Sequence, residues 1–169
     1  MGFSVYDASV PVFSAMLANL ASVLEKGEEN AISRKIEPSV FLNARLAPDM
    51  LNLTKQVQIA TDHARNAPSR LAGRALVSQP DVETDFAGLK TRIAAVQEHL
   101  AGFSRADMED AAERQITLKI GGQELNVPGA DYLLRFATPN FYFHMTAAYA
   151  ILRHNGVPLG KADFLQVRR

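Results

Sequence analysis

Hydrophobic residues recur at spacings of three and four along four long stretches of this chain, which is the periodicity of amphipathic helices. The pattern predicts long helices that begin near Ser4, near Pro48, within residues 81–84 and near Asp131. A short apolar segment over residues 38–46 predicts one or two further helical turns. The chain is therefore expected to be all-α, a four-helix bundle with one small β-hairpin between the third and fourth long helices.

Capping residues and helix breakers set the expected ends of these helices. In the first helix, Ser4 and Ser9 are alternative N-terminal caps, and we favour Ser4, with a kink at Pro11. The helix is expected to end within residues 26–33, where Gly27 and Asn30 break the apolar period. The segment 67–81 is rich in Ser, Gly and Pro and has no period, so we expect it to be a loop that follows the second helix.

The stretch from Asp131 to Gly156 carries most of the candidate chemistry. About 100° of rotation per residue places five apolar residues on one face, namely Leu133, Phe136, Phe143, Ala147 and Ile151. Asn140 and His144 fall in the middle of that face and need partners, because an unpaired buried polar group costs about 1 to 3 kcal/mol. Pro139 predicts a kink or break just before Asn140, and Gly156 predicts a left-handed C-terminal cap.

The second helix adds a line of polar residues. Pro48 suits its first turn, and Asp49, Gln56 and His63 are spaced seven apart, so they lie along one edge of the helix. The simplest interpretation is that Asp49 stabilises the helix N-terminus and that His63 is solvated. Gln56 lies in the middle of the helix beside apolar residues and is expected to face a polar partner.

Residues 116–127 alternate between apolar and polar around Gly121 and Gly122, the pair that a two-residue hairpin turn prefers. Closing the turn there predicts the cross-strand pairs Lys119 with Glu124, Leu118 with Leu125, and Ile116 with Val127. The apolar pairs share one face. We therefore expect the hairpin to pack on the outside of the bundle.

Composition limits the functional classes. At 169 residues and 47% hydrophobic content, the chain is expected to form a single domain over residues 1–169. Its 18 basic and 18 acidic residues cancel, which argues against binding to nucleic acid. There are no cysteines, no secretory signal pattern and no uninterrupted apolar run near the roughly 18 residues of a membrane span. We expect a cytoplasmic protein that neither binds nucleic acid nor enters a membrane.

The segment HMTAAYAILRHNGVPLGK resembles the end of the last helix in the DinB-like superfamily, where a histidine stands nine residues before an arginine and a glycine turn and a proline follow. The stretches SVYDASVPVF, LAPDM and PNFYFH are similar to an uncharacterised bacterial branch of that superfamily with no known function. The resemblance spans nearly the whole chain. It implies a four-helix bundle with long crossovers, and in many branches a divalent metal held by three histidines.

The metal ligands of that superfamily map incompletely onto this chain. The resemblance places the two histidines of its last helix at Asn140 and His144, and the third ligand at Gln56, with Gln58 or His63 as alternatives. Amide oxygens are weak ligands for zinc or nickel. We therefore expect that no such metal is tightly bound, and that Gln56, Asn140 and His144 satisfy one another as a buried hydrogen-bond network.

Two functions from different classes fit these residues. One is a small-molecule-binding or structural homodimer with a degenerate metal site, which uses the aromatic cluster of residues 141–143 as a pocket or as an interface. The alternative, implied by the resemblance, is a divalent-metal-dependent enzyme related to thiol transferases, with His144 as metal ligand or general base and Asp49 orienting it. The candidate pocket residues are Asp49, Gln56, Asn140, Tyr142 and His144.

The resemblance also implies a homodimer, because superfamily members commonly pair through faces of the bundle. The first helix also favours a dimer, since its apolar residues spread widely around its axis, although the sequence does not identify the interface. These residues are Val5, Val10, Val12, Phe13 and Leu17.

Overall fold

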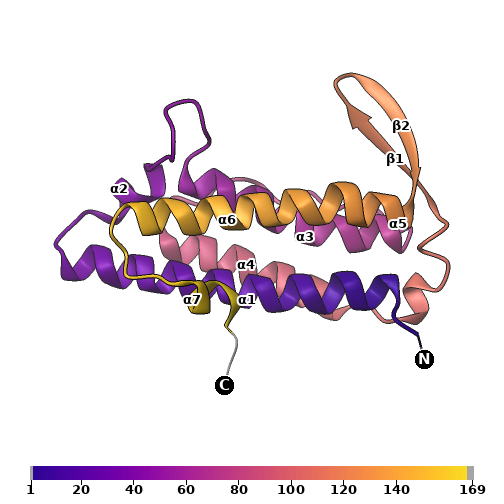
Figure 1. Cartoon of the computed structure of the whole chain (residues 1–169), viewed down its shortest axis with the longest axis horizontal. Helices are drawn as coiled ribbons and strands as arrows, with labels where there is room; N and C mark the ends of the chain where they lie inside the picture. Colours follow the sequence, from indigo (N-terminus) through magenta and orange to yellow (C-terminus); the bar gives the residue numbers. More distant parts are fainter. Residues whose placement is uncertain (1, 167–169) are drawn as a thin grey trace.

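The computed structural model describes residues 2–166, so the extreme ends of the predicted domain lie outside the described residues. Two layers of helices pack face to face, with α3 beside α6 in one layer and α1 beside α4 in the other (Figure 1). The helices are α1 Val5–Ser33, α2 Pro38–Asn43, α3 Leu53–Leu71, α4 Phe86–Ala101, α5 Gly129–Tyr132, α6 Thr138–His154 and α7 Lys161–Leu165, and the strands are β1 Gln115–Ile120 and β2 Gln123–Pro128. The predicted helical bundle with a small hairpin is confirmed.

Helix α1 begins at the earlier of the two predicted caps. The Ser4 hydroxyl accepts a hydrogen bond from the Asp7 N–H, and the Asp7 carboxylate accepts one from the Ser4 N–H, which forms a capping box. The helix ends at Ser33, the last residue of the segment in which its end was expected. A Cβ at position 27 would lie 2.9 Å from Cδ2 of Leu152. Gly27 therefore allows α1 and α6 to approach closely and does not end the helix.

The hydropathy of α1 bears on two expectations. An 18-residue window of this helix has a mean hydropathy of 1.4, enough to cross a membrane by length and composition alone, although no uninterrupted apolar run reaches that length. Half of that window is buried in the bundle, and the core helix of a soluble protein meets the same criterion. Val10, Phe13 and Leu17 belong to this core and do not form a free dimer face, contrary to expectation.

Helix α3 has different ends from those predicted. It begins at Leu53 because Asn52 caps it, with Oδ1 accepting the Lys55 N–H at 3.0 Å. Pro48 and Asp49 therefore lie before the helix, in a loop over residues 44–52 that stands out from the bundle (Figure 1). The helix then continues through Pro68 to Leu71, so the predicted loop begins later, at residue 72.

A buried arginine on α4 holds the following part of the chain in place. The Arg92 side chain is fully buried, and it donates to Thr61 Oγ1 at 2.7 Å. Its guanidinium also pairs with Asp62 at 2.7 Å, with Glu83 at 3.1 Å and with Asp81 at 3.2 Å. Asp81 and Glu83 belong to the loop between α3 and α4. Arg92 on α4 therefore binds this loop and α3 at the same time.

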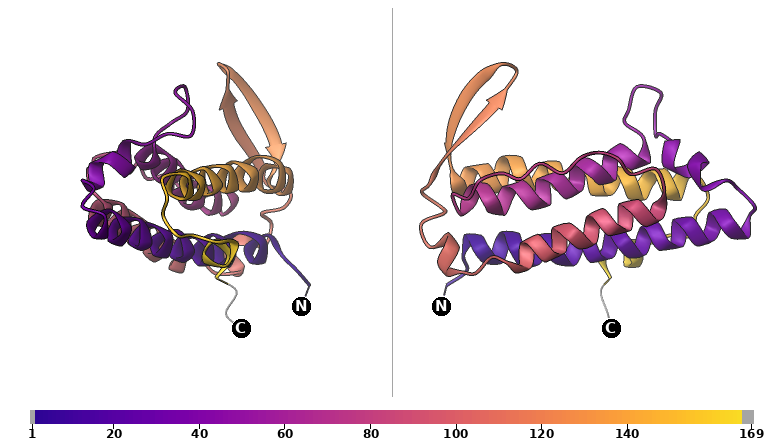
Figure 2. Two further views of the ribbon diagram at one scale, coloured as in Figure 1. Left: turned by 60° about the vertical axis from the view of Figure 1, so that its left-hand side comes forward. Right: turned by 180° about the vertical axis from the view of Figure 1, so that it is seen from behind.

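The hairpin has the predicted register at every pair. Ile116 and Leu118 of β1 are buried, whereas Leu125 of β2 is 50% exposed and the hairpin rises away from the end of the bundle (Figures 1 and 2). The expectation that both strands lie against the bundle is therefore wrong for β2. A Cβ on Gly129 would lie 1.9 Å from the Ala111 carbonyl oxygen, so this glycine holds the base of the hairpin close to the preceding segment.

The last long helix contains a π-helical segment in place of the predicted break. The chain runs from α5 through the π segment Leu133–Ala137 into α6, and the Thr138 N–H donates to the Leu133 carbonyl five residues back. Pro139 follows directly and has no N–H to donate. Gly156 has a φ of +89°, which confirms the predicted left-handed residue at the helix end.

The π segment changes the helical phase between the start of the last helix and α6. It adds one residue to a turn, so the residues that follow lag by roughly 100° relative to a regular helix. Leu133, Ala147 and Ile151 of the predicted apolar face are buried, whereas Phe143 of the same face is 57% exposed. The other buried residues of α6 are Phe141, Met145, Ala148 and Leu152. Asn140 and His144 therefore lie at the edge of the core and not at its centre.

Candidate functional site

The strongest contact at the predicted site joins α3 to α6. His144 Nδ1 lies 2.7 Å from Gln56 Oε1, and the Gln56 amide is buried. Gln56 Nε2 donates to the Leu51 carbonyl at 3.1 Å. A carbonyl can only accept, so this bond fixes the orientation of the amide and turns Oε1 towards the imidazole.

The orientation of Gln56 fixes the tautomer of His144. Oε1 is an acceptor only, so Nδ1 must carry the imidazole proton and donate it. In the neutral ring Nε2 is then left with a free lone pair. His144 thus presents an oriented hydrogen-bond acceptor, and the same atom is the one that would act as a base or bind a metal.

A second imidazole lies against the first. The rings of His63 and His144 stack with centroids 6.0 Å apart and planes 14° apart, and Phe136 meets His63 edge to face at 6.1 Å. Burial, reinforced by the neighbouring His144, lowers the pKa of His63 to about 4, and burial also lowers the pKa of His144. The expectation that His63 is solvated is therefore wrong, and both rings are neutral at pH 7.

Asn140 does not join this cluster. Its Nδ2 donates to the Phe136 carbonyl at 2.7 Å, one turn back in its own helix. The predicted network of Gln56, Asn140 and His144 is therefore correct for its first and third members only. Asn140 instead donates a hydrogen bond to the backbone of the π segment.

The remaining predicted residues lie around the cluster. Asp49 is exposed in the 44–52 loop and makes no side-chain hydrogen bond or ion pair within residues 2–166, so a contact that orients His144 is not seen. Gln58 points the other way, with Nε2 donating to Glu83 at 2.7 Å. Tyr142 is half-buried and packs edge to face on Phe141 at 5.4 Å; burial raises the pKa of its phenol.

A groove of about 390 Å³ runs beside the imidazole pair, and Tyr142 is the one predicted pocket residue among its lining residues. Its lining residues are largely apolar and come from the 44–52 loop and α6, namely Leu46, Met50, Tyr142, Phe143, Thr146, Ala147 and Ala150. The Phe143 ring also meets the His144 ring, at 5.2 Å and 90°. Phe143 is therefore the side chain shared by the groove and the histidine cluster.

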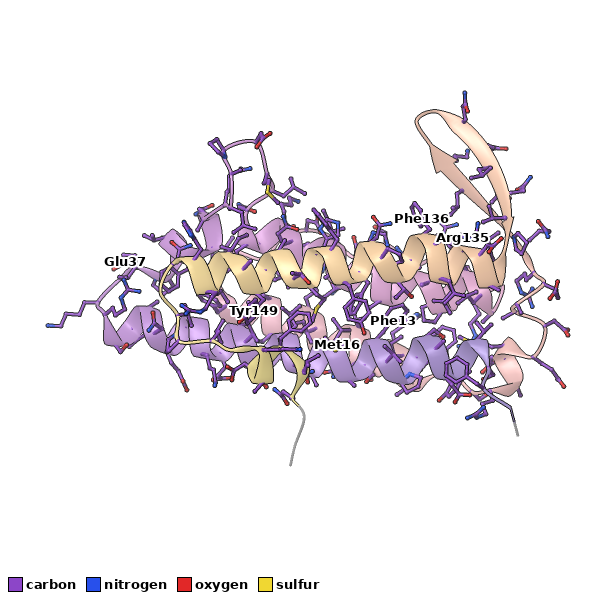
Figure 3. The ribbon with its side chains drawn as sticks, in the orientation of Figure 1. Phe13, Met16, Glu37, Arg135, Phe136 and Tyr149 are labelled. Carbon is purple, nitrogen blue, oxygen red and sulfur yellow. The ribbon has the colours of Figure 1, made fainter. Side chains whose placement is uncertain are left out.

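Both features lie on what we call the outer face, the side of the α3–α6 layer that carries the hairpin and the 44–52 loop. Figure 3 shows Phe136 on this side of the last helix, whereas Phe13 of α1 lies between the two layers. Leu51, which accepts the hydrogen bond from Gln56, belongs to the same loop. The outer face therefore brings together an apolar groove, two neutral imidazoles and a free acceptor.

Comparisons with known proteins agree with this architecture. A family model described as a domain of unknown function, DUF1993, matches residues 5–165. A crystal structure of a DinB family member protein from Shewanella denitrificans is 45% identical, with a TM-score of 0.89 over 95% of this chain and 91% of that chain. This chain belongs to the DinB family. The match to the DUF1993 model places it in a branch of that family with unknown function, and a search of curated proteins found no match.

The donor atoms of this DinB family chain do not fit a tightly held divalent metal. Within residues 2–166 no three His, Cys, Asp or Glu side chains converge as a metal site would require. Gln56 Oε1 is occupied by His144, and the Asn140 amide is bound to a backbone carbonyl. The Nε2 atom of His144 and the neighbouring His63 ring remain, which is fewer than the three or four protein ligands that zinc takes.

A double-mutant cycle tests the pairing at this site. Gln56→Leu and His144→Phe are expected to couple by about 1 to 2 kcal/mol in the free energy of unfolding, because each single change leaves a buried polar atom unpaired. Asn140→Leu is the matched control, because it removes an amide one turn away that does not touch the imidazole. Its coupling with His144→Phe is expected to be close to zero. Urea denaturation of the single and double variants measures both values, and equal couplings would contradict the assignment.

Proposed function

We propose that this DinB family protein binds a small neutral molecule on its outer face, with Nε2 of His144 as the hydrogen-bond acceptor that orients the ligand. The observation that carries the proposal is the chain of hydrogen bonds from the Leu51 carbonyl through Gln56 to His144. This chain holds the imidazole in one tautomer before any ligand arrives, and preorganisation of this kind reduces the cost of binding.

The surroundings of His144 support a particular ligand chemistry. Both imidazoles are neutral because burial lowers their pKa values, so they offer no positive charge to an anion at pH 7. Phe136, Phe143 and the groove beside them supply apolar and aromatic surface. A mostly apolar surface with a few polar groups is the usual form of a small-molecule site. The ligand is therefore an apolar or aromatic molecule that carries one hydroxyl or N–H donor.

Phenol and anisole provide a matched pair of probes, because they share the aromatic ring and only phenol can donate a hydrogen bond. Phenol is expected to move the Nε2 resonance of His144 in proton–nitrogen correlation spectra at pH 7.5, and anisole is expected to leave it nearly unchanged. The variant His144→Phe keeps an aromatic ring and should weaken phenol binding by roughly tenfold, the effect of one hydrogen bond near 1.4 kcal/mol. Equal responses to the two probes would contradict the acceptor role.

A divalent-metal-dependent enzyme, related to the thiol transferases of the superfamily, is the second candidate. One observation favours it: a metal-binding histidine commonly donates its other ring N–H to a fixed acceptor, as His144 does to Gln56. The incomplete donor set argues that any such metal is weakly held.

Metal analysis separates the two candidates. We expect protein purified without a histidine tag to contain far less than one equivalent of zinc or nickel. The variant Gln56→His with Asn140→His should gain a site, because the residue at 56 already touches His144 and position 140 is one turn away on the same helix. Stoichiometric metal in the wild-type protein would favour the enzyme. A folded double variant that binds neither metal would show that the three positions do not converge.

The oligomeric state and location are also part of the proposal. A homodimer in the cytoplasm remains our expectation, but the exposed apolar residues Leu46, Leu51 and Phe143 now make the outer face a better interface than α1. Sedimentation velocity at micromolar concentration should give a species of twice 18.5 kDa. The variant Phe143→Ser should shift it towards the monomer, and a wild-type monomer at all concentrations would refute the dimer.

A further inference from the structure

A polar cavity lies on the opposite side of α3 from the histidine cluster. It has a volume of about 330 Å³ and lies between α2, α3 and the loop that leads into α4. Its polar lining residues are Asn43, Asn52, Thr54, Lys55, Gln58, Asp81, Glu83 and Thr84. None of the hydrogen bonds that define the outer face involves these residues.

Gln58 forms part of the wall and has one atom without a partner. Its side chain is 2% exposed, and its Nε2 donates to Glu83 Oε2 at 2.7 Å. Its Oε1 is buried and accepts no hydrogen bond within the part of the chain that the structure describes. The amide cannot be turned over to relieve this, because Glu83 can only accept. A buried acceptor left in this state costs about 1 to 3 kcal/mol unless a bound group donates to it.

Three of the donor side chains around this cavity already have acceptors. The Thr54 hydroxyl donates to the Leu42 carbonyl at 3.2 Å, and Asn43 Nδ2 donates to the Ser39 carbonyl at 2.9 Å. Lys55 Nζ lies 2.9 Å from Asp81. The wall therefore presents mainly lone pairs, so a ligand that fits must supply hydrogen-bond donors.

Charge points to the same kind of ligand. The wall contains two carboxylates, those of Asp81 and Glu83, and one ammonium group, that of Lys55. Burial alone would raise the pKa of Glu83, but hydrogen bonds from Gln58 and Arg92 outweigh it and hold the pKa below its usual value. Glu83 is thus ionised at pH 7. The fully buried guanidinium of Arg92 pairs with both carboxylates from behind the wall and also with Asp62, so its one positive charge is divided among three carboxylates.

We propose that this cavity binds a small organic cation with several N–H donors, of the guanidinium type, and that Gln58 Oε1 accepts one of those donors. The wall of this cavity already binds one guanidinium, because Arg92 pairs with Asp81 and Glu83. This site is separate from the outer face and does not depend on the function proposed for His144.

Methylguanidinium is the probe, and two related compounds separate its properties. Urea has planar N–H donors without charge, and tetramethylammonium has charge without donors. In proton–nitrogen correlation spectra of the full chain, methylguanidinium should give a saturable shift of the Gln58 side-chain amide and of the backbone amides of Lys55 and Glu83. Urea and tetramethylammonium should each bind at least about fivefold more weakly, because urea lacks the charge and tetramethylammonium lacks the N–H donors.

Three variants test the assignment, and each is expected to change the affinity for methylguanidinium differently. Gln58→Met removes the acceptor and should weaken methylguanidinium binding about tenfold. Lys55→Met removes the competing cation from Asp81 and should tighten binding severalfold. Gln97→Met makes the same change as Gln58→Met on α4, where the side chain donates to the Ser14 carbonyl, and should leave binding unchanged.

Several results would overturn the proposal. These are no saturable shift at Gln58, an equal response to urea or tetramethylammonium, or weaker binding by Lys55→Met. If Gln58→Met does not fold, the Lys55→Met and Gln97→Met variants still decide the question, because both substitute side chains away from the Gln58–Glu83 contact. If a folded Gln58→Met variant binds methylguanidinium with undiminished affinity, Gln58 Oε1 does not accept a hydrogen bond from the ligand and the proposal is wrong.

Discussion

The buried guanidinium of Arg92 is the constraint on which the arrangement of α3 depends. A buried charge is tolerated only when it is paired, and removing one partner from such a pair typically costs about 3 to 5 kcal/mol. Arg92 meets this demand with Thr61 and Asp62 on α3 and with Asp81 and Glu83 in the loop before α4. These contacts fix the rotation of α3 about its axis.

The rotation of α3 then decides what faces α6. Gln56 and His63 are seven residues apart and share one edge of the helix, while Gln58 lies about 200° round from Gln56. When Thr61 and Asp62 turn towards Arg92, Gln56 and His63 turn towards α6, where both meet His144. One ion cluster therefore places the imidazole pair on one side of α3 and the polar cavity at Gln58 on the other.

The sequence predicts those features that are set by local rules. The register of the hairpin follows from the alternation of its residues and from Gly121 and Gly122, and the start of α1 follows from the capping residues Ser4 and Asp7. The convergence of Gln56 and His144 follows from helical phase and from the resemblance to the DinB family. In each case the deciding residues are few and their geometry is regular.

Features that depend on distant partners or irregular turns were missed. The sequence does not show that Arg92 is buried, because two of its partners, Asp81 and Glu83, lie in a loop. The path of a loop cannot be predicted from hydrophobic periodicity. A count of 100° per residue cannot detect the π segment, and Phe143 lies beyond the edge of the surface that α6 buries. Pro48 and Asn52 are both valid signals for a helix start, and the choice between them required the tertiary structure.

The imidazole pair on the outer face is stable only while it is neutral. The folded-state pKa of His63 is about 4, below its ordinary value of 6.5, so above pH 6.5 neither the folded nor the unfolded chain carries this proton. Between these values the unfolded chain binds the proton and the folded chain does not, so the stability that depends on His63 is lost as pH falls through this window. Protonation of His144 would also remove the free lone pair on Nε2. The same burial that keeps both rings neutral therefore provides the acceptor and makes the site sensitive to acid.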